Sequence, residues 1–355
     1  MSEKVLMKGN EAIGEAAIAA GCRYYFGYPI TPQTELAEYM AKRMAEVNGV
    51  FLQAESEVAA INMVYGAAGA GARTMTSSSS PGISLKQEGI SYIAGAELPC
   101  VIVNISRGGP GLGSIQPSQA DYFQATKGGG HGDYRNIVIA PNSVQELVNH
   151  TIKAFDLADK YRNPVMVLGD GALGQMMEPV LLPERILAST PKPWAATGLR
   201  GRSKPNIINS LYLIPNQLEE HNLRLQKKYY DISKAEVMYE EYNTDEAELI
   251  IVAYGITSRI ARSAIDKARK DGYKVGLLRP ITLWPFPVDI FTKLANTAKA
   301  FLTLELSAGQ MVEDVRLSVN GCKPVYFYGR MGGMIPSTKE IYGQIVKYYS
   351  NGGEQ

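Results

Sequence analysis

A threonine hydroxyl in a rigid turn is the first group in this sequence that could do chemistry. Thr31 lies within Tyr28-Pro29-Ile30-Thr31-Pro32, where two prolines restrict the backbone on both sides. The turn closes a predicted strand, YYFGYP at 24–29, and ligands bind at the carboxyl ends of strands in open α/β sheets. A stiff turn before a helix accounts for the same residues without a ligand, so both interpretations stay open.

Two glutamates at the predicted start of a helix are the second candidate. They lie in Glu55-Ser56-Glu57-Val58-Ala59-Ala60, and Gly66 follows nine residues after Glu57. Acidic residues in a first helical turn usually stabilise the helix dipole and the cap. The functional alternative requires a ligand that needs a buried carboxylate as a hydrogen-bond acceptor or proton relay. The residues by themselves favour the structural interpretation.

The third candidate is a glycine-rich loop with one arginine, Ser106-Arg107-Gly108-Gly109-Pro110-Gly111-Leu112-Gly113. Glycines let a backbone approach a ligand closely, and a guanidinium can bind a carboxylate or phosphate through two parallel hydrogen bonds. The segment TSSSSPG at 76–82, which includes Ser78 and Ser79, adds hydroxyls after the preceding predicted strand. We expect the polar loops at 28–32, 76–82 and 106–113 to converge at one sheet edge, because they follow consecutive predicted strands.

A fourth pattern, GDGALG at 169–174, matches the G-x-G-x-x-G signature of dinucleotide sites and follows a predicted strand. Pro179 and Pro183 follow soon after it and leave no room for a full helix and a second strand. No acidic residue stands where the ribose contact would be needed. The sequence therefore argues against a nucleotide site here.

Short apolar strands alternate with helices on both sides of a polar stretch, and this alternation predicts the scaffold for the loops. Capping boxes at 143–146 and 337–340 mark two of the helix starts. We expect two doubly wound, mostly parallel-sheet α/β domains at 1–185 and 246–355, joined by a connector at 186–245. The predicted strands lie at 24–29, 50–53, 73–77, 99–106, 136–141, 164–170, 248–255, 274–287, 300–306 and 325–329.

The composition limits the function. The net charge of +1, without runs of like charge, gives no electrostatic basis for binding nucleic acid or an anionic membrane. Cys22, Cys100 and Cys322 lie far apart, so the chain has neither a disulfide framework nor the cysteine groups that iron–sulfur clusters need. It has no apolar signal core and no run of about 20 apolar residues. We expect a soluble, cytoplasmic protein.

Taken together, these segments resemble the α-type subunit of 2-oxoacid:ferredoxin oxidoreductases. YPITP, ESE-x-A-A and TSSSSPG carry the similarity. It extends over essentially the whole chain through RGGPGLG, QPSQAD (116–121), HGDYR (131–135), LLRPITLWPFP (277–287), ELSAGQM (305–311) and GRMGGMIP (329–336). KGNEAIGEAAIAAG, QAESEVA and GPGLGSIQPSQADYFQA are more similar to the branched-chain (2-oxoisovalerate) type than to the 2-oxoglutarate type.

The resemblance implies a thiamine-diphosphate pyrimidine-binding fold followed by a transketolase C-terminal-like fold. It also implies oxidation of a 2-oxo acid to acyl-coenzyme A and CO2 with reduction of ferredoxin. In thiamine enzymes a glutamate hydrogen-bonds the aminopyrimidine ring, within an E-x-A-A pattern that has a glycine nine residues on. Glu57 with Gly66 meets that spacing, whereas Glu55 does not.

The resemblance also assigns roles to the other candidate residues. Thr31 would lie beside the carboxylate and ketone of the substrate, and Arg107 would hold the carboxylate. His131, in a glycine-rich loop, has either a structural role or a role in proton handling. The residues expected to contact the cofactor, besides Glu57, are Tyr28, Pro29, Ile30, Ser78 and Ser79.

Some parts of such an enzyme are missing from this sequence. Thiamine enzymes hold the diphosphate through Mg2+ with a GDG motif and a later asparagine, and here GDG at 169–171 is followed by WAATGLR at 194–200. The resemblance therefore implies that a diphosphate-domain (beta-type) subunit binds the diphosphate and Mg2+, and we expect no metal ligands here. Iron–sulfur clusters would lie on other chains, with a gamma-type and a ferredoxin-like subunit as further partners and ferredoxin as external acceptor.

Four alternatives remain beside a branched-chain enzyme subunit. The same reaction on 2-oxoglutarate or pyruvate is the first. A transketolase-like transferase would need histidines for sugar phosphates, and the chain has only 3. A nucleotide-binding module would have to use GDGALG. A non-catalytic scaffold leaves Thr31, Glu57 and Arg107 at converging positions without an explanation.

Overall fold

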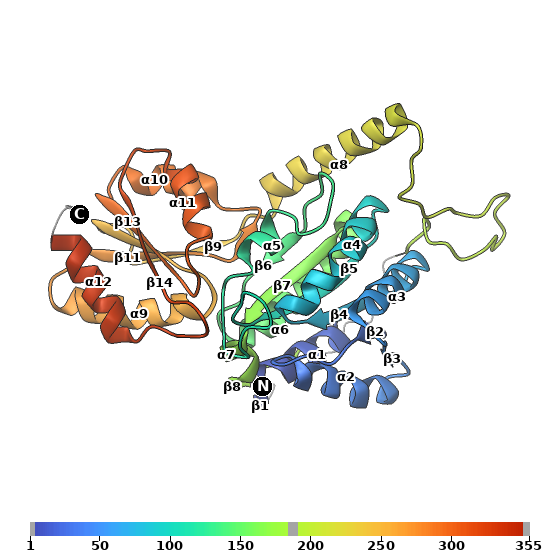
Figure 1. The fold of residues 1–355 in the computed structure, drawn as a ribbon, viewed down its shortest axis with the longest axis horizontal. Helices are drawn as coiled ribbons and strands as arrows, with labels where there is room; N and C mark the ends of the chain where they lie inside the picture. Colours follow the sequence, from blue (N-terminus) through green and yellow to red (C-terminus); the bar gives the residue numbers. More distant parts are fainter. Residues whose placement is uncertain (1–3, 184–190, 351–355) are drawn as a thin grey trace.

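The apolar runs of the first half assemble into one seven-stranded sheet in the computed structural model, which describes residues 4–183 and 191–350 (Figure 1). Its strands are β2 (Tyr24–Gly27), β3 (Val50–Gln53), β4 (Thr74–Ser78), β5 (Cys100–Ser106), β6 (Ile137–Ile139), β7 (Pro164–Asp170) and β12 (Thr282–Trp284). Their order is β12-β6-β7-β5-β4-β2-β3, and every neighbouring pair except β12 with β6 is parallel. Every residue of β4, β5 and β7 is buried, and for β5 and β7 this burial on both faces explains their largely apolar sequences.

Helices cover this sheet on both faces. They are α1 (Gly9–Ala19), α2 (Thr34–Glu46), α3 (Glu57–Gly69), α4 (Ser80–Gly95), α5 (Tyr122–Thr126), α6 (Val144–Tyr161) and α7 (Gly171–Gln175). Helix α1 packs against α2 and α6, whereas α3 packs against α4. Because α3 and α4 each begin directly behind a strand, their first turns lie at the carboxyl edge of the sheet.

A second sheet forms the other unit of the molecule, at the left of Figure 1. Its strands are β9 (Tyr239–Tyr242), β10 (Leu249–Val252), β11 (Val275–Pro280), β13 (Ala300–Glu305) and β14 (Val325–Gly329), in the order β14-β13-β10-β11-β9. Only β9 runs antiparallel to its neighbour. The helices of this unit are α9 (Gly255–Lys270), α10 (Val288–Ala295), α11 (Met311–Val319) and α12 (Thr338–Ser350). The predicted fold class, two mostly parallel α/β units, is confirmed.

The two units share strands and side chains. Strand β9 comes from the expected connector and joins the second sheet, whereas β12 follows β11 in the chain and pairs with β6 of the first sheet. Arg279 of β11 donates two hydrogen bonds of 2.8 Å to Glu146 of α6 and one of 2.8 Å to Glu240. The expected domain boundary at 185/186 lies outside the described residues.

The connector contains one long helix and one irregular arm. Helix α8 (Pro215–Ala235) lies against the end of α4, where His221 Nε2 is 2.7 Å from the Gly95 carbonyl oxygen. Residues 191–214 form no helix or strand and extend beyond α3 and α4 (Figure 1). In the part of the chain that the structure describes, no helix combines the length and apolar character needed to cross a membrane.

Of two sequence expectations about local structure, the first was wrong and the second is confirmed. TSSSSPG is not a loop: its first serines end β4, and α4 begins at Ser80 with Pro81 in its first turn. Proline suits that position because the N–H it lacks would have no partner within the helix. GDGALG is followed by no second parallel strand, because α7 has five residues and β8 (Met177–Val180) then pairs antiparallel with β1 (Val5–Lys8). The pattern therefore lies outside any βαβ unit.

Candidate active site

The start of α3 holds Glu57 in the protein interior. Ser56 caps the helix, with its hydroxyl accepting a hydrogen bond of 3.1 Å from the Ala59 N–H. This cap fixes the direction of the first turn. Glu57, the first residue of the helix, is only 6% exposed, whereas Glu55 is exposed. The two glutamates therefore differ in burial, although both lie near the start of the helix, where either could stabilise the helix dipole.

The Glu57 side chain lies against the first turn of α4. A Cβ atom added to Gly82 would stand 2.7 Å from Glu57 Oε1 and 2.0 Å from Ser78 Oγ. The Glu57 carboxylate therefore occupies space that a side chain at residue 82 would fill. No hydrogen bond joins the Glu57 carboxylate to another group of the described chain. The hydroxyls of Ser78 and Ser79 are fully buried and also lack a partner within the described residues.

The Tyr28–Pro32 turn is held to α1 by a hydrogen bond at Pro32, and most of its other residues are exposed. Tyr28 and Thr31 are exposed at the carboxyl end of β2, together with Pro29, whereas Ile30 is half-buried. The Asn10 amide of α1 donates a hydrogen bond of 2.8 Å to the carbonyl oxygen of Pro32. The Thr31 hydroxyl is therefore presented on a fixed backbone at the surface of this chain.

Arg107 lies close to Thr31, as the sequence predicted, but it contacts the backbone of Thr31 and not the hydroxyl. Its guanidinium donates to the Thr31 carbonyl oxygen at 2.9 Å and to the Leu112 carbonyl oxygen at 3.1 Å. The side chain is 8% exposed, and its Nε–H is buried without a partner. A guanidinium has five N–H donors, so donors remain for a ligand after these two contacts.

A cavity of about 620 Å3 opens beside Arg107, between the two units. The first unit contributes Arg107, Gly108 to Gly111 and Asp121, and the second contributes Leu306, Gln310 and Met331. The two walls touch directly, because a Cβ on Gly108 would lie 3.2 Å from the Gly332 carbonyl carbon. Glu57 does not line this cavity; the start of α4 at Ser80 lines it instead.

Asp121 is a site residue to which the sequence gave no role. Its Oδ2 accepts hydrogen bonds from Ser80 Oγ at 2.6 Å and Asn104 Nδ2 at 2.8 Å. Burial raises the pKa of the Asp121 carboxyl, and these hydrogen bonds oppose the shift. Asp121 is the last residue of QPSQAD (116–121), a segment that resembles a family signature but from which the sequence predicted no site residue.

His131 and Asp170 lie outside the cluster around Glu57 and Arg107. The His131 ring packs edge-on against Tyr92 at 5.8 Å, in a separate cavity of about 250 Å3. Asp170, the aspartate of GDG, caps α7 by accepting hydrogen bonds from the N–H groups of Ala172 at 2.9 Å and Leu173 at 3.1 Å. Burial raises the pKa of Asp170 to about 6. Within residues 4–183 and 191–350, no group of three or more His, Cys, Asp or Glu could hold a metal ion.

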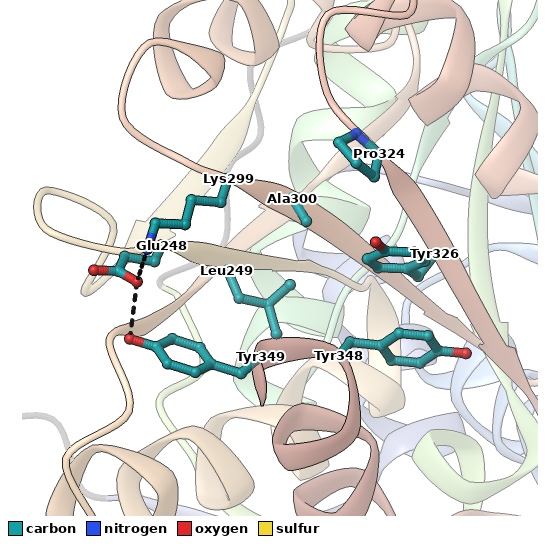
Figure 2. Close-up of a pocket in the computed structure, with 8 residues that line it drawn as sticks. All are labelled: Glu248, Leu249, Lys299, Ala300, Pro324, Tyr326, Tyr348 and Tyr349. Atoms are coloured by element: carbon teal, nitrogen blue, oxygen red, sulfur yellow. Dashed lines mark hydrogen bonds and ion pairs between the residues drawn. The ribbon is translucent and has the colours of Figure 1, made fainter. Parts of the chain in front are cut away.

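A cleft in the second unit is a poor candidate for a site (Figure 2). It holds about 60 Å3 and lies at the first residues of β10 and β13, the edge opposite to where α/β sheets bind ligands. Glu248 accepts hydrogen bonds there from Lys299 and Tyr349, and Tyr326 stacks on Tyr348 with centroids 4.5 Å apart. These polar groups are paired with one another, as in a structural contact.

Comparison with known proteins gives consistent matches over both units. Residues 15–243 match the family described as pyruvate flavodoxin/ferredoxin oxidoreductase, thiamine diphosphate-binding, and residues 247–341 match pyruvate:ferredoxin oxidoreductase core domain II. The ketoisovalerate oxidoreductase subunit VorB of Methanothermobacter marburgensis is 54% identical over 341 residues, which is 96% of each chain. The 2-oxoglutarate synthase subunit KorA of Methanothermobacter thermautotrophicus is 37% identical over 381 residues, 98% of this chain and 99% of the relative.

Solved structures give the same picture. The 2-oxoglutarate:ferredoxin oxidoreductase from Magnetococcus marinus, with 2-oxoglutarate, coenzyme A and succinyl-CoA bound, matches with a TM-score of 0.88 and 28% identity. The match covers 98% of this chain and 65% of that one, so this chain spans just under two thirds of that longer chain. A split-gene transketolase, an inactive beta4 tetramer, shares the fold with a TM-score of 0.61 and 14% identity over 97% of this chain and 98% of that one.

Proposed function

Because this chain belongs to the 2-oxoacid:ferredoxin oxidoreductase family, as the motifs indicated, we propose that it supplies the pyrimidine half of a thiamine-diphosphate site. The observation that carries the proposal is Glu57, a carboxylate buried at the carboxyl edge of the sheet without a hydrogen-bond partner within the described chain. A buried carboxylate in this state is costly unless a ligand completes it.

The residues around Glu57 fit the aminopyrimidine end of thiamine diphosphate. The Glu57 carboxylate can accept a hydrogen bond from a ring nitrogen, and the unpaired hydroxyl of Ser78 lies beside it. Tyr28 and Pro29 are exposed at the carboxyl end of β2 and offer apolar surface to an aromatic ring. Thiamine diphosphate bound there would supply carbanion chemistry at its C2 carbon for addition to the ketone of a 2-oxo acid. Glu57 would hold and return the proton at the ring nitrogen.

Arg107 and Thr31 form the substrate side of the proposed site. Arg107 lines the cavity, and the guanidinium donors left after its two backbone contacts would hold the carboxylate of a 2-oxo acid. Thr31 would place its hydroxyl beside the carboxylate and ketone, because the contact from Arg107 to its carbonyl oxygen fixes the turn. These two residues bind and orient the substrate, whereas Glu57 handles the proton.

The proposed substrate is a branched-chain 2-oxo acid, 2-oxoisovalerate, with coenzyme A as acyl acceptor. Among the described residues that line the cavity, Arg107 is the cationic one, while Leu306, Met331 and Pro110 give apolar surface. This suits a single carboxylate with an apolar tail, whereas the second carboxylate of 2-oxoglutarate would meet Asp121. The 54% identity to a ketoisovalerate oxidoreductase subunit, against 37% to a 2-oxoglutarate synthase subunit, points the same way.

The proposed partners are a diphosphate-domain (beta-type) subunit, a gamma-type subunit and a ferredoxin-like subunit, with ferredoxin as the external acceptor. Asp170 of GDG is engaged as a helix cap, so Mg2+ and diphosphate would be held by the beta-type subunit. Apolar side chains are exposed on the strand that precedes Glu57 and on the helix that carries it, at Val50 (41%) and Leu52 (39%) of β3 and at Val58 (45%) of α3. Such a patch beside the candidate site suits a partner subunit that completes it.

The same proposal places the enzyme in the cytoplasm. All three cysteines are free, and burial raises the pKa of the Cys22 and Cys100 thiols to about 12. Protonated, buried thiols are consistent with a reducing compartment.

Reconstitution tests the proposed function. We expect the purified chain alone to show no turnover of 2-oxoisovalerate with coenzyme A and a viologen acceptor, and the beta-type, gamma-type and ferredoxin-like subunits to restore it. In the assembled enzyme, Glu57→Ala should slow C2 proton exchange of bound thiamine diphosphate by about 100-fold or more, the scale of general acid–base catalysis. The exposed Glu55→Ala is the matched control. Turnover by the single chain, or unchanged exchange in Glu57→Ala, would refute the proposal.

A further inference from the structure

A fully buried lysine, Lys86, stands one helical turn beyond Gly82 on α4 and has no part in the function proposed above. Its side chain is 0% exposed. The ammonium group donates to Thr76 Oγ1 at 2.7 Å and to the Ser77 carbonyl oxygen at 2.9 Å, both on β4. An ammonium has three donors, and its removal from water costs several kcal/mol unless a charge compensates it.

Glu57 is the charge that acts on Lys86. Gly82 and Lys86 are four residues apart on α4 and so project from the same face, and Glu57 Oε1 lies directly against Gly82. Burial lowers the pKa of Lys86 to about 7, and the negative charge of Glu57 opposes that shift. The acid and the lysine therefore lie in one buried polar cluster, where the charge of the acid acts on the lysine.

The other polar groups in this cluster are neutral. Tyr25 of β2 and Gln33 both reach the Ser77 hydroxyl, at 2.6 and 2.5 Å. Burial raises the pKa of Tyr25, so its hydroxyl keeps its proton. Ser78 is buried and unpaired beside Glu57. Among the described residues, the charged group that influences Lys86 is thus Glu57.

We propose that Lys86 is a positioning residue whose buried ammonium compensates the Glu57 carboxylate from the protein side and sets the proton affinity of that acid. The inference rests on the proposed role of Glu57. Below about pH 7, where Lys86 carries its proton, this positive neighbour favours the ionised carboxylate, so it lowers the affinity of the Glu57–aminopyrimidine pair for a proton. Without Lys86 the pair holds its proton to higher pH. Hydrogen bonds to Thr76 and Ser77 keep the ammonium in place.

The first test is the pH profile of C2 proton exchange in the assembled enzyme loaded with thiamine diphosphate. Lys86→Met removes the charge and keeps an unbranched apolar chain, and we expect the apparent pKa of exchange to rise by about one pH unit. Thr76→Ser is the control: it changes the residue that Lys86 contacts but keeps the hydroxyl and the charge, so the profile should not shift. A Lys86→Met enzyme that exchanges with the wild-type pH profile would overturn the proposal.

The second test uses the full chain without cofactor and does not depend on Lys86→Met folding. The pKa of Lys86 is about 7 in the folded chain and 10.5 ordinarily, so the unfolded chain binds a proton that the folded chain lacks between these values. The stability to urea should therefore gain a rising contribution from about pH 7 to about pH 10. Glu57→Gln removes the opposing charge, so the rise should begin about one pH unit lower.

The two tests separate the inference from the function on which it rests. If wild-type exchange depends on Glu57 but the Lys86→Met profile and the Glu57→Gln stability curve are unshifted, only the role of Lys86 is rejected. If exchange does not depend on Glu57, the proposed function is rejected as well. A shift in both measurements supports Lys86 as the group that sets the acid's proton affinity.

Discussion

The two sheets each hold a glutamate–lysine pair, and the pairs have opposite environments. Glu248 and Lys299 meet at 2.7 Å at the amino edge of the second sheet, where Lys299 is 75% exposed and Tyr349 also donates to Glu248 (Figure 2). Glu57 and Lys86 lie at the carboxyl edge of the first sheet, 6% and 0% exposed, and Glu57 lacks a hydrogen-bond partner within the described chain. The residue types are the same, but burial and pairing differ.

The difference separates a structural pair from a functional one. An exposed ion pair is screened by water and contributes little to stability. A buried acid whose hydrogen bonds are incomplete costs stability, and such groups concentrate where a ligand completes them. The sheet edge supports the same division, because the carboxyl edge is the ligand-binding edge of an α/β sheet. Three substitutions test it, in order of expected effect.

Gly82→Ala should have the largest effect. The new Cβ would meet Ser78 Oγ at 2.0 Å and Glu57 Oε1 at 2.7 Å, so the carboxylate must move. A displacement of about 1 Å in a catalytic group can cost about 100-fold, and we expect a fall of that order in C2 proton exchange. Gly343→Ala on α12 is the control, because no atom lies within 4 Å of its Cβ position. Exchange that survives Gly82→Ala would remove Glu57 from the site.

Arg107→Ala should lower kcat/KM for 2-oxoisovalerate by about 10- to 100-fold, mainly through a higher KM, because the lost contact binds the carboxylate in ground and transition states alike. Steady-state kinetics of the assembled enzyme measure this. Arg107→Lys keeps the charge but lacks the planar fork, so its kcat/KM should fall between the two. Arg43→Ala, which removes a surface contact to Glu15, is the matched control. An unaltered kcat/KM in Arg107→Ala would place the carboxylate elsewhere.

Lys299→Met should have the smallest effect. It removes the partner of Glu248 from an exposed pair, and we expect the Tm of the chain to change by less than about 2 °C. The pH profile of C2 exchange should stay where it is, in contrast to Lys86→Met. A large loss of stability, or a shifted profile, would show that the comparison between the two pairs is wrong.

The sequence predicted most elements because their patterns are local. The strand at 50–53 and the helix start at Glu57 were predicted as the structure has them, as was the cap between Ser143 and Glu146. Strands β1, β8, β9 and β12 were missed as separate elements, because short strands are defined by their partners and those lie far away in the chain. Residues 76–82 were expected to form a loop, but α4 begins at Ser80. Pro81 indicates this start in the sequence, because proline is favoured in the first turn of a helix.

The candidate site was predictable in its residue types and only partly in its geometry. Residue spacing and resemblance together selected Glu57 over Glu55, and burial makes the same choice. The contact between Arg107 and Thr31 was expected through a shared substrate, but the structure adds a direct bond to the Thr31 carbonyl oxygen. Asp121 was missed because its role depends on Ser80 and Asn104, which come from other parts of the chain.

By itself the sequence determined the order of most elements and the motifs at the strand ends, because these depend on residues a few positions apart. It also determined the family, because the family is recognised from such short motifs. Only the tertiary structure decided which charged groups are out of water. A lysine in a helix is usually solvated, and nothing near Lys86 in the sequence indicates otherwise. It is buried because α4 packs against α3 and β5, which places Thr76 and Ser77 in contact with the ammonium group and Glu57 close enough for its charge to act on it.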